Sequence, residues 1–412
     1  MDFLLKHLRF GLYPFTSQSP GKKALHFGAG SIGRGFIGAL LSSAGYEVVF
    51  ADVSKPIIEA LNKERSYNIH ILDLERNGEI DRINHVSGIL STNDADVIKA
   101  ITEVSIITTA VGPGVLTELA IKISAGIKAR RAAGITSELN IIACENLPGA
   151  SSLLHEEILK NLTSDEDKAY LDAKVGFPNC TVDRIVPPFT DGQEGVLAVG
   201  VENFHEWIVE KSAIKGPKLD IPGMTLTDNL TAYIERKLFT LNTGHAICAY
   251  LGFLKGYATV DESLSDRRIE EIVRNAMLES GAALCKKHGF DEKEHEKYID
   301  KIQSRFRNPY IKDDVVRVGR EPIRKLSPDD RLVGPVKMAE EFGLRYDNLL
   351  KGIAAALRYE NPEDRQSEEL NSRIKEEGVG KVVAEIIGFA EDTHENREIV
   401  SSYEHLGMKE RL

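Results

Sequence analysis

The sequence predicts an α/β protein in which an N-terminal Rossmann-type parallel-sheet domain precedes a mostly α-helical C-terminal domain. In the first half, short apolar runs alternate with helix-like stretches, a pattern typical of a parallel sheet covered on both faces. A glycine-rich turn directly follows the first apolar run. After about residue 217, long amphipathic segments follow one another with few strand candidates. We therefore expect a dinucleotide-binding domain over 22–217 and a helical substrate domain over 218–412.

Four apolar runs account for the predicted sheet. They are rich in β-branched and apolar residues, as buried parallel strands are. The runs are Ala24–Phe27, Glu47–Asp52, Val104–Val111 and Asn140–Asn146. Stretches with helical character, such as 35–44 and 115–128, lie between them.

The second half is predicted to be helical. Apolar residues of Asp266–Lys287 fall on one helical stripe, and the basic end of this segment is followed by Gly289, as at a helix C-terminus. Asn348–Tyr359 is a second amphipathic segment, and a polar, charged stretch follows it near Pro362–Glu377.

Composition excludes several classes of protein. The 412 residues carry 52 Lys and Arg against 63 Asp and Glu, and a formal net charge of −11 argues against a general nucleic-acid or anionic-membrane binder. No apolar run is long enough to span a bilayer. The four cysteines (Cys144, Cys180, Cys248 and Cys285) stand singly, so we expect neither a zinc site nor a disulfide framework. We expect a cytoplasmic protein that binds no metal.

Residues 1–21 precede the first predicted strand and do not fit the inferred fold. They include Lys6, Arg9 and several apolar residues, but they lack the apolar core of a secretory signal. We interpret them as a disordered extension. A mitochondrial-type transit peptide is the alternative, although such peptides usually contain more Arg and Ser.

The segment from Gly28 to Gly33 fits the pattern G-x-G-x-x-G between a strand and a helix. Gly28 permits a tight turn, Gly30 permits close approach of a pyrophosphate, and Gly33 permits close packing of helix on strand. Ser31 and Ile32 lie inside the turn, at the start of the helix whose N-terminus favours phosphate charge. A turn that merely connects strand to helix is the alternative interpretation.

Asp52 ends the next predicted strand, nineteen residues after Gly33. A carboxylate at this place accepts hydrogen bonds from ribose hydroxyls and repels a 2′-phosphate, which favours NAD over NADP. Val111 follows a further strand and either lines the same crevice or belongs to an ordinary loop.

In the helical half, Lys237, Asn242 and His245 stand among apolar residues. On a regular helix, at about 100° per residue, His245 lies about 80° and Asn242 about 140° from Lys237. The three side chains converge only if the lysine reaches over or the helix distorts near Gly244. Taken alone, a lysine extending from a core helix and a buried Asn/His pair explain the pattern equally well.

The pattern K-x4-N-x2-H after a dinucleotide-binding half resembles the polyol-specific long-chain dehydrogenase/reductase family. The resemblance covers about residues 22–390. It rests on the opening KKALHFGAGSIGRGFIG and on the segments Cys144–Pro148, Phe177–Arg184, Lys237–His245, Arg305–Pro309 and Val318–Leu326. It implies a zinc-independent, NAD-dependent polyol dehydrogenase.

The resemblance also implies roles for individual residues. Lys237 corresponds to the general base, and Asn146 and Asn242 to the pair that stabilises the alkoxide oxygen. His245 is implied to contact a substrate hydroxyl, and Asp183 to lie at the substrate pocket. A lysine can serve as base only if its pKa falls from ~10.4 toward ~7–8, for which an apolar setting is suitable.

Four cations lie within nine residues of an otherwise acidic chain: Arg317, Arg320, Arg324 and Lys325. Guanidinium groups bind phosphate in a bidentate manner, so this cluster is the candidate for a substrate phosphate. A solvated basic loop, ion-paired with its acidic neighbours, is the alternative. Arg317 can instead contact sugar hydroxyls.

These segments favour the branch of the family that interconverts D-mannitol 1-phosphate and D-fructose 6-phosphate. The alternatives are a mannitol 2-dehydrogenase acting on the free polyol, a reductase of the hexuronates tagaturonate and fructuronate, and a non-enzymatic NAD-binding sensor or scaffold. The partners expected are a small sugar phosphate and neither nucleic acid nor membrane, and the resemblance suggests a monomer.

Overall fold

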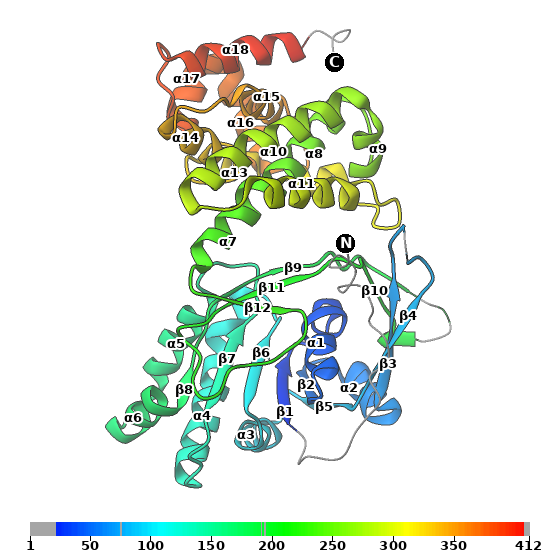
Figure 1. Ribbon diagram of the computed structural model, residues 1–412, viewed down its shortest axis with the longest axis vertical. Helices are drawn as coiled ribbons and strands as arrows, with labels where there is room; N and C mark the ends of the chain where they lie inside the picture. The colour runs from blue at the N-terminus through cyan, green and yellow to red at the C-terminus, as the bar shows by residue number, and fades with distance from the viewer. Residues whose placement is uncertain (1–21, 75, 191, 193–194, 408–412) are drawn as a thin grey trace, which may run out of the picture.

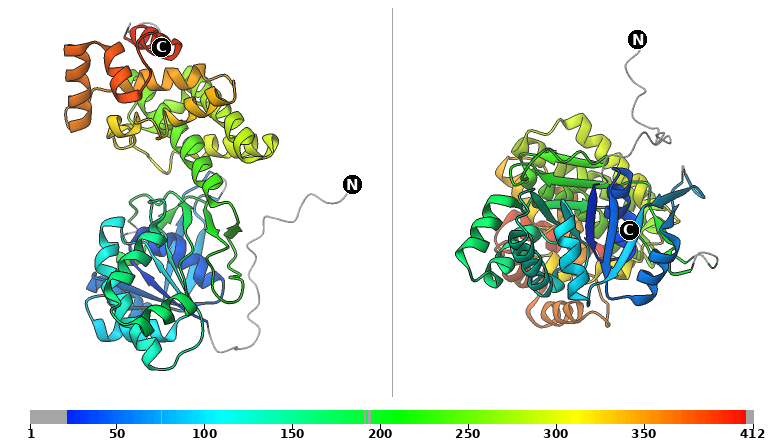
Figure 2. Two further views of the ribbon diagram at one scale, coloured as in Figure 1. Left: turned by 90° about the vertical axis from the view of Figure 1, so that its left-hand side faces the viewer. Right: turned by 90° about the horizontal axis from the view of Figure 1, so that it is seen from below.

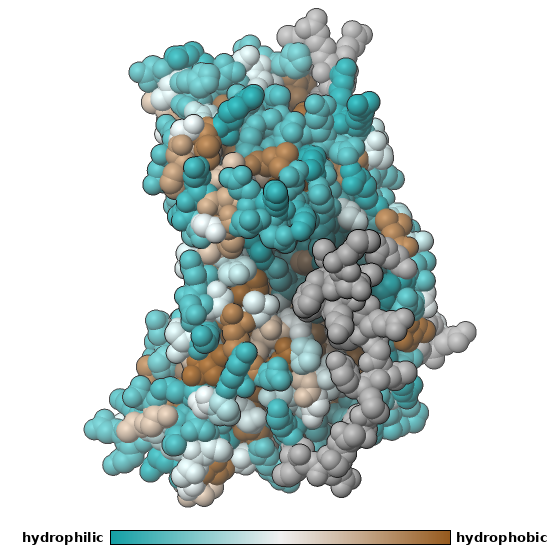
Figure 3. Space-filling model, in the orientation of Figure 1, coloured by the Kyte–Doolittle hydropathy of each residue, from teal (hydrophilic) through white to brown (hydrophobic). Residues whose placement is uncertain are grey.

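The computed structural model describes residues 22–74, 76–190, 192 and 195–407. The expected extension over residues 1–21 lies outside them. Figure 1 shows two parts, one above the other, with strands in the lower part and helices filling the upper part. The space-filling view in Figure 3 shows the surface narrowing between them. The predicted fold class is confirmed.

A six-stranded sheet forms the centre of the lower part, within the described residues. It consists, in spatial order, of β5 (Val86–Leu90), β2 (Glu47–Asp52), β1 (Lys23–Phe27), β6 (Ile106–Thr109), β7 (Leu139–Ala143) and β8 (Val175–Gly176). All neighbours pair in parallel. This is the doubly wound order, in which the strand sequence reverses direction between β1 and β6. A ligand crevice is therefore expected beyond the carboxyl ends of these two strands.

Helices cover both faces of the sheet (Figure 2). Alternate side chains of a strand point to opposite faces. Leu25 of β1 accordingly joins an apolar cluster with α3 and α4, whereas Phe50 of β2 joins another with Ile58 of α2. The helices of this part are α1 (Gly38–Ser43), α2 (Lys55–Glu64), α3 (Asp94–Glu103), α4 (Leu116–Ala132), α5 (Ala150–Asn161) and α6 (Asp165–Lys174), with a π-helical turn at Gly33–Ile37 and 3₁₀ turns at Pro113–Val115 and Gly195–Leu197.

Two smaller sheets, which the sequence interpretation did not include, accompany the six-stranded sheet. One contains β10 (Val199–Val201), β3 (Ser66–Ile71) and β4 (Ile80–Asn84), and the other β12 (Met224–Thr227), β11 (Glu206–Glu210) and β9 (Cys180–Asp183). Since β12 pairs with β11, the sheet-containing part continues beyond residue 217. The first helix of the upper part begins at Leu230.

The upper part packs around one apolar core. Ile247, Val273 and Ile353, from three different helices, are fully buried in it. Its helices are α7 (Leu230–Arg236), α8 (Thr243–Lys255), α9 (Val260–Ser265), α10 (Arg267–His288), α11 (Glu292–Phe306), α12 (Val315–Gly319), α13 (Pro322–Lys325), α14 (Gly334–Glu341), α15 (Asp347–Leu357), α16 (Arg365–Glu377), α17 (Val379–Val382) and α18 (His394–Leu406), with π-helical turns at Lys237–Asn242 and Val383–Ile387. The predicted ending of α10 is observed, since Gly289 adopts a left-handed conformation with φ 72°.

Among the described residues, no helix has both the length and the apolar character needed to cross a bilayer.

Candidate active site

The glycine turn lies at the carboxyl end of β1, where the ligand crevice is expected. Gly28 has φ 101°, and a Cβ there would lie 2.4 Å from the carbonyl oxygen of Ala110, beyond β6. A Cβ on Gly33 would lie 1.9 Å from the carbonyl oxygen of Gly28, so the helix packs directly on the turn. A Cβ on Gly30 meets no atom within 4 Å. The turn is therefore tightly packed at Gly28 and Gly33 and open at Gly30, as a pyrophosphate requires.

Asp52 is fixed beside this turn. Its Oδ2 accepts a hydrogen bond from the Ala29 amide at 2.6 Å, and its Oδ1 accepts one from the Ser54 amide at 2.8 Å. Each carboxylate oxygen keeps a further acceptor position, since an ionised carboxylate accepts about four hydrogen bonds. Ser31 and Ile32 begin the following helix and are exposed. These residues fit the dinucleotide role that the sequence predicts for them.

A buried carboxylate that the sequence interpretation passed over holds the opposite wall of the crevice. Glu145 accepts hydrogen bonds from the Thr109 hydroxyl at 2.7 Å and from the amides of Val111 and Gly112 at 3.0 and 2.9 Å. Val111 therefore lies against the glycine turn, with its Cγ1 3.3 Å from the place of a Cβ on Gly28. The available signal was an acid two residues after a mostly apolar strand.

Lys237 begins a π-helical turn that ends at Asn242 and joins α7 to α8. The hydrogen bonds of such a turn run from i to i+5, so Asn242 follows Lys237 by one wide turn. A regular helix would have separated them by about 140°. The distortion that the sequence interpretation required near Gly244 is thus present just before it. The Asn242 side chain has no hydrogen-bond partner in the part of the chain that the structure describes.

The amine of Lys237 reaches from the helical part to the sheet-containing part. Its Nζ donates to the Val182 carbonyl at 2.7 Å and to Asn146 Oδ1 at 3.2 Å. Burial lowers the pKa of Lys237, and Arg305 and Arg331 lower it further, whereas Asp183 opposes this change. Two of the three predicted catalytic residues are therefore in contact, and the third lies one π turn away.

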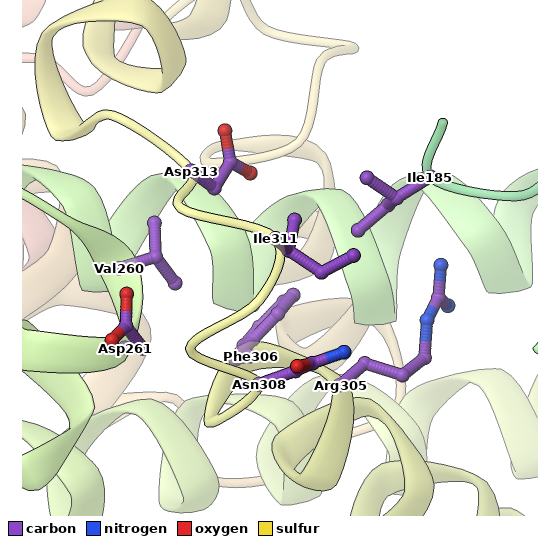
Figure 4. A pocket seen from close by; sticks show the side chains of 8 residues that line it. All are labelled: Ile185, Val260, Asp261, Arg305, Phe306, Asn308, Ile311 and Asp313. Atoms are coloured by element: carbon purple, nitrogen blue, oxygen red, sulfur yellow. The ribbon is translucent and has the colours of Figure 1, made fainter. Parts of the chain in front are cut away.

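His245 lies one helical turn beyond Asn242. Its Nε2 lies 2.6 Å from Asp313 Oδ2, and its ring stacks on Phe306 with 4.9 Å between the centroids. Phe306 and Asp313 also line a small pocket, to which the sheet-containing part contributes Ile185 (Figure 4). Neither Phe306 nor Asp313 was singled out from the sequence.

Asp183 is buried in an ion pair at the end of β9. Arg305 of α11 donates to both of its oxygens, at 2.8 and 2.9 Å, and also binds Glu202. Burial alone would raise the pKa of Asp183, but Arg305 holds it below its ordinary value. The sequence interpretation placed Asp183 at the substrate pocket and gave no role to Arg305.

The four predicted phosphate-binding cations differ in their surroundings. Arg317 pairs with Asp313, and Arg324 pairs with Glu321 and Asp330. Arg320 is exposed, and its guanidinium has no partner among the described residues. Lys325 is only 3% exposed, so the interpretation of this segment as a solvated loop is wrong for this residue.

The buried Lys325 has no carboxylate partner among the described residues, and its Nζ donates to the Arg320 carbonyl. Burial, together with Arg331 and Arg324, lowers the pKa of Lys325 to about 7. Arg331, which the sequence interpretation missed, thus lies near enough to influence both Lys325 and Lys237.

Comparison with known proteins assigns the family. The model of the mannitol dehydrogenase Rossmann domain matches residues 22–223, and that of the mannitol dehydrogenase C-terminal domain matches residues 229–406. The chain belongs to the mannitol dehydrogenase family. The resemblance found in the sequence is therefore confirmed at the level of the family.

Two solved structures share the fold of this mannitol dehydrogenase family member. A substrate-free D-sorbitol dehydrogenase is 17% identical, with a TM-score of 0.79 and coverage of 94% of each chain. The Pseudomonas fluorescens mannitol 2-dehydrogenase, in a ternary complex with NAD and D-mannitol, is 20% identical, with a TM-score of 0.67 and coverage of 94% of this chain and 91% of its own.

Membership in the mannitol dehydrogenase family makes the chain an oxidoreductase with NAD as its cofactor. The crevice fits this group, because Gly30 leaves space for the pyrophosphate and Asp52 presents a carboxylate for the ribose. The amine of Lys237 contacts Asn146, which follows β7 of the same sheet.

Proposed function

We propose that the protein is an NAD-dependent mannitol-1-phosphate 5-dehydrogenase, which interconverts D-mannitol 1-phosphate and D-fructose 6-phosphate. The observation that carries this proposal is the half-buried Lys237 amine, whose pKa is lowered, in contact with Asn146 at the cofactor crevice. An amine whose pKa is lowered releases its proton more readily and can exchange it with a substrate hydroxyl.

In the oxidation of the polyol, Lys237 takes the proton of a secondary hydroxyl while a carbonyl forms at the same carbon. The glycine turn and Asp52 would hold NAD, which would supply the acceptor for the hydride that leaves this carbon. Asn146 presents its Oδ1 to Lys237, which leaves its Nδ2 free to donate to the alkoxide. Asn242 supplies the second donor. In the reduction of the ketone, the protonated amine returns its proton to the oxygen.

Specificity for a phosphate is supported by the cations beyond Lys237. Arg331 influences the amines of both Lys237 and Lys325, so positive charge continues from the reacting end toward the exposed Arg320. A buried amine without a carboxylate partner is stabilised in its charged form by a bound anion. We assign Arg320 and Lys325 to the phosphate end of the substrate.

A free polyol is the second candidate substrate, because Arg317 and Arg324 are already paired with carboxylates. Arg317, held by Asp313 beside His245, then contacts sugar hydroxyls instead. We further propose a cytoplasmic protein that works as a single chain, since one chain supplies the crevice, Lys237 and both asparagines.

A substrate panel tests the proposal. The purified full chain is mixed with NADH or NADPH and with fructose 6-phosphate, fructose, tagaturonate or fructuronate, and absorbance is followed. We expect NADH oxidation with fructose 6-phosphate and none in the Lys237→Met variant, which retains NADH binding. Turnover with free fructose alone moves the assignment to the mannitol 2-dehydrogenases. Turnover mainly with the uronates moves it to the hexuronate reductases, and none with any sugar favours the sensor.

A further inference from the structure

A buried cluster of three charged side chains connects the two parts of the molecule beside Lys237. Arg305, of α11, is 7% exposed, and its carboxylate partners Asp183 and Glu202 are 8% and 1% exposed. Both acids belong to the sheet-containing part, where Asp183 ends β9 and Glu202 follows β10. Figure 4 shows the Arg305 side chain extending from its helix on the side of the pocket where Ile185 lies.

The guanidinium of Arg305 is almost fully used. It donates from Nη1 and Nη2 to Asp183, at 2.8 and 2.9 Å, and from Nε and Nη2 to Glu202, both at 2.8 Å. The Phe204 ring lies 4.1 Å below its Cζ. Such a bidentate arrangement fixes a carboxylate in orientation as well as in charge.

One peptide unit, between Val182 and Asp183, connects the cluster to the proposed base. The Val182 carbonyl, which accepts a hydrogen bond from Lys237 Nζ at 2.7 Å, immediately precedes Asp183. By holding Asp183, Arg305 therefore also fixes the carbonyl to which the amine is bound. Both oxygens of Asp183 are directed to Arg305, so the carboxylate does not form an ion pair with Lys237.

We propose that Arg305 is a positioning residue for the reaction: it fixes and neutralises Asp183, so that the neighbouring Lys237 amine can release its proton and act as a base. This inference rests on the proposed role of Lys237. An ammonium beside an unpaired carboxylate stays protonated, since an opposite charge nearby favours the charged form.

The other charged groups around Lys237 do not replace this effect. Glu206, of β11, is engaged by Arg236 at 2.6 Å. Arg331, which precedes α14, is paired with Asp330 at 2.8 Å and acts in the same direction as Arg305. Asp183 is the remaining acid, and Arg305 is the cation that holds it.

The test compares the acid–base behaviour of Lys237 in Arg305→Gln, Arg305→Lys and Asp183→Asn variants of the full chain. One readout is the pH at which kcat/KM for polyol oxidation falls on the acid side. The other, independent of turnover, is the pH midpoint for acylation of the Lys237 amine by acetic anhydride, followed by peptide mass spectrometry.

We expect Arg305→Gln to move both midpoints to higher pH, by about one unit or more. Arg305→Lys should show little of this shift, because it keeps the positive charge beside Asp183. Asp183→Asn should move the acylation midpoint to lower pH, and combining it with Arg305→Gln should bring the midpoint back toward that of the unmodified protein. If Arg305→Gln does not fold, the shift of the acylation midpoint in Asp183→Asn still decides the question.

Arg131→Gln is the matched control. Arg131 lies at the C-terminal end of α4 in the sheet-containing part, and the substitution breaks its ion pair with the buried Asp167. It should lower the melting temperature and leave both midpoints unchanged. Midpoints unchanged in Arg305→Gln and in Asp183→Asn would overturn the inference. That result leaves the proposed function intact if Lys237→Met is inactive, whereas an active Lys237→Met defeats the proposed function itself.

Discussion

Lys237 Nζ lies 3.2 Å from Asn146 Oδ1, although the two residues are 91 positions apart and belong to different parts of the molecule. Asn146 follows the end of β7, and Lys237 begins the π turn between α7 and α8. The contact brings an amide with free N–H donors beside an amine with a lowered pKa.

This contact predicts the effect of removing the amide. Asn146→Ala should lower kcat for either direction by about 10²–10³, the usual loss when one donor to a developing oxyanion is removed. Steady-state kinetics, together with NADH binding by fluorescence, will measure it. Asn161→Ala, in which the lost amide donates only to a carbonyl of α5, is the control. A kcat for Asn146→Ala within a few-fold of the unmodified protein would exclude the proposed role.

Glu145 should be needed for an ordered crevice wall. In Glu145→Gln, one of the two side-chain oxygens is replaced by an NH2 group, so the amide of either Val111 or Gly112 loses its acceptor. Leaving a buried donor unpaired costs about 1–3 kcal/mol, so both the free energy of unfolding and NADH affinity should fall. Denaturant unfolding and fluorescence titration measure the two. Glu118→Gln, on the exposed face of α4, should change neither, and an equal loss in both variants would contradict the prediction.

Asp52 should determine which dinucleotide is used. In Asp52→Asn the charge that repels a 2′-phosphate is gone, while one oxygen still accepts a backbone N–H. The ratio of kcat/KM for NADPH to that for NADH should rise at least about tenfold, equivalent to ~1.4 kcal/mol. Kinetics with both cofactors at saturating substrate test this. An unchanged ratio would show that Asp52 does not face the ribose.

Arg320 should act on phosphorylated substrates alone. Its exposed guanidinium is unpaired within the described part of the chain, so Arg320→Ala removes a donor available to a phosphate. The KM for fructose 6-phosphate should rise about 10- to 100-fold, since hydrogen bonds to charged groups contribute ~1.5–3 kcal/mol. Arg345→Ala, at an exposed ion pair with Asp347, is the control. An equal rise for free fructose would defeat the phosphate assignment.

Lys325 should make stability depend on pH above neutrality. Its pKa is about 7 in the folded protein against an ordinary 10.5, so between these values the unfolded chain binds a proton that the folded chain does not. The contribution of Lys325 to the free energy of unfolding therefore rises with pH in this window, by at most about 1.4 kcal/mol per unit. Below pH 7 both states are protonated and the full cost of the buried ammonium remains.

Denaturant unfolding between pH 6.5 and 9.5 measures this slope. Lys325→Met should have a smaller slope than the unmodified protein, and Lys337→Met, at an exposed lysine of α14, should not. If the slopes of Lys325→Met and the unmodified protein coincide, Lys325 does not titrate in this range.

Fructose 6-phosphate bound at Lys325 should be accompanied by proton uptake near pH 8, measurable by calorimetry in two buffers.

The sequence was most informative where one local rule decided the structure. Glu47–Asp52 is predicted and observed as a strand, because a short run rich in β-branched and aromatic residues favours a buried strand of a parallel sheet. The edge strand β4 (Ile80–Asn84) carries no such signal, since most of its residues are exposed and it pairs only with β3. The polar 362–377 stretch contains α16, which Asp364 caps and Leu370 anchors in the core.

The candidate site could be predicted by residue type but not by geometry. A period of 3.6 residues cannot show that Lys237–Asn242 forms a π turn. Nor could the sequence show which cations of the basic segment are paired, because Lys325 and Arg324 are neighbours with opposite surroundings. Arg305 lies in one of the segments that carry the family resemblance. Its partners Asp183 and Glu202, however, lie more than 100 positions away in the sequence.

The run from α7 through the π turn into α8 places the proposed base on a segment that packs on β9 and β11 at one end and enters the helical core at the other. The chemistry therefore belongs to neither half alone. Neither half alone contains both Lys237 and Asn146. Replacing either half by that of an unrelated protein would therefore remove part of the proposed site and abolish the reaction.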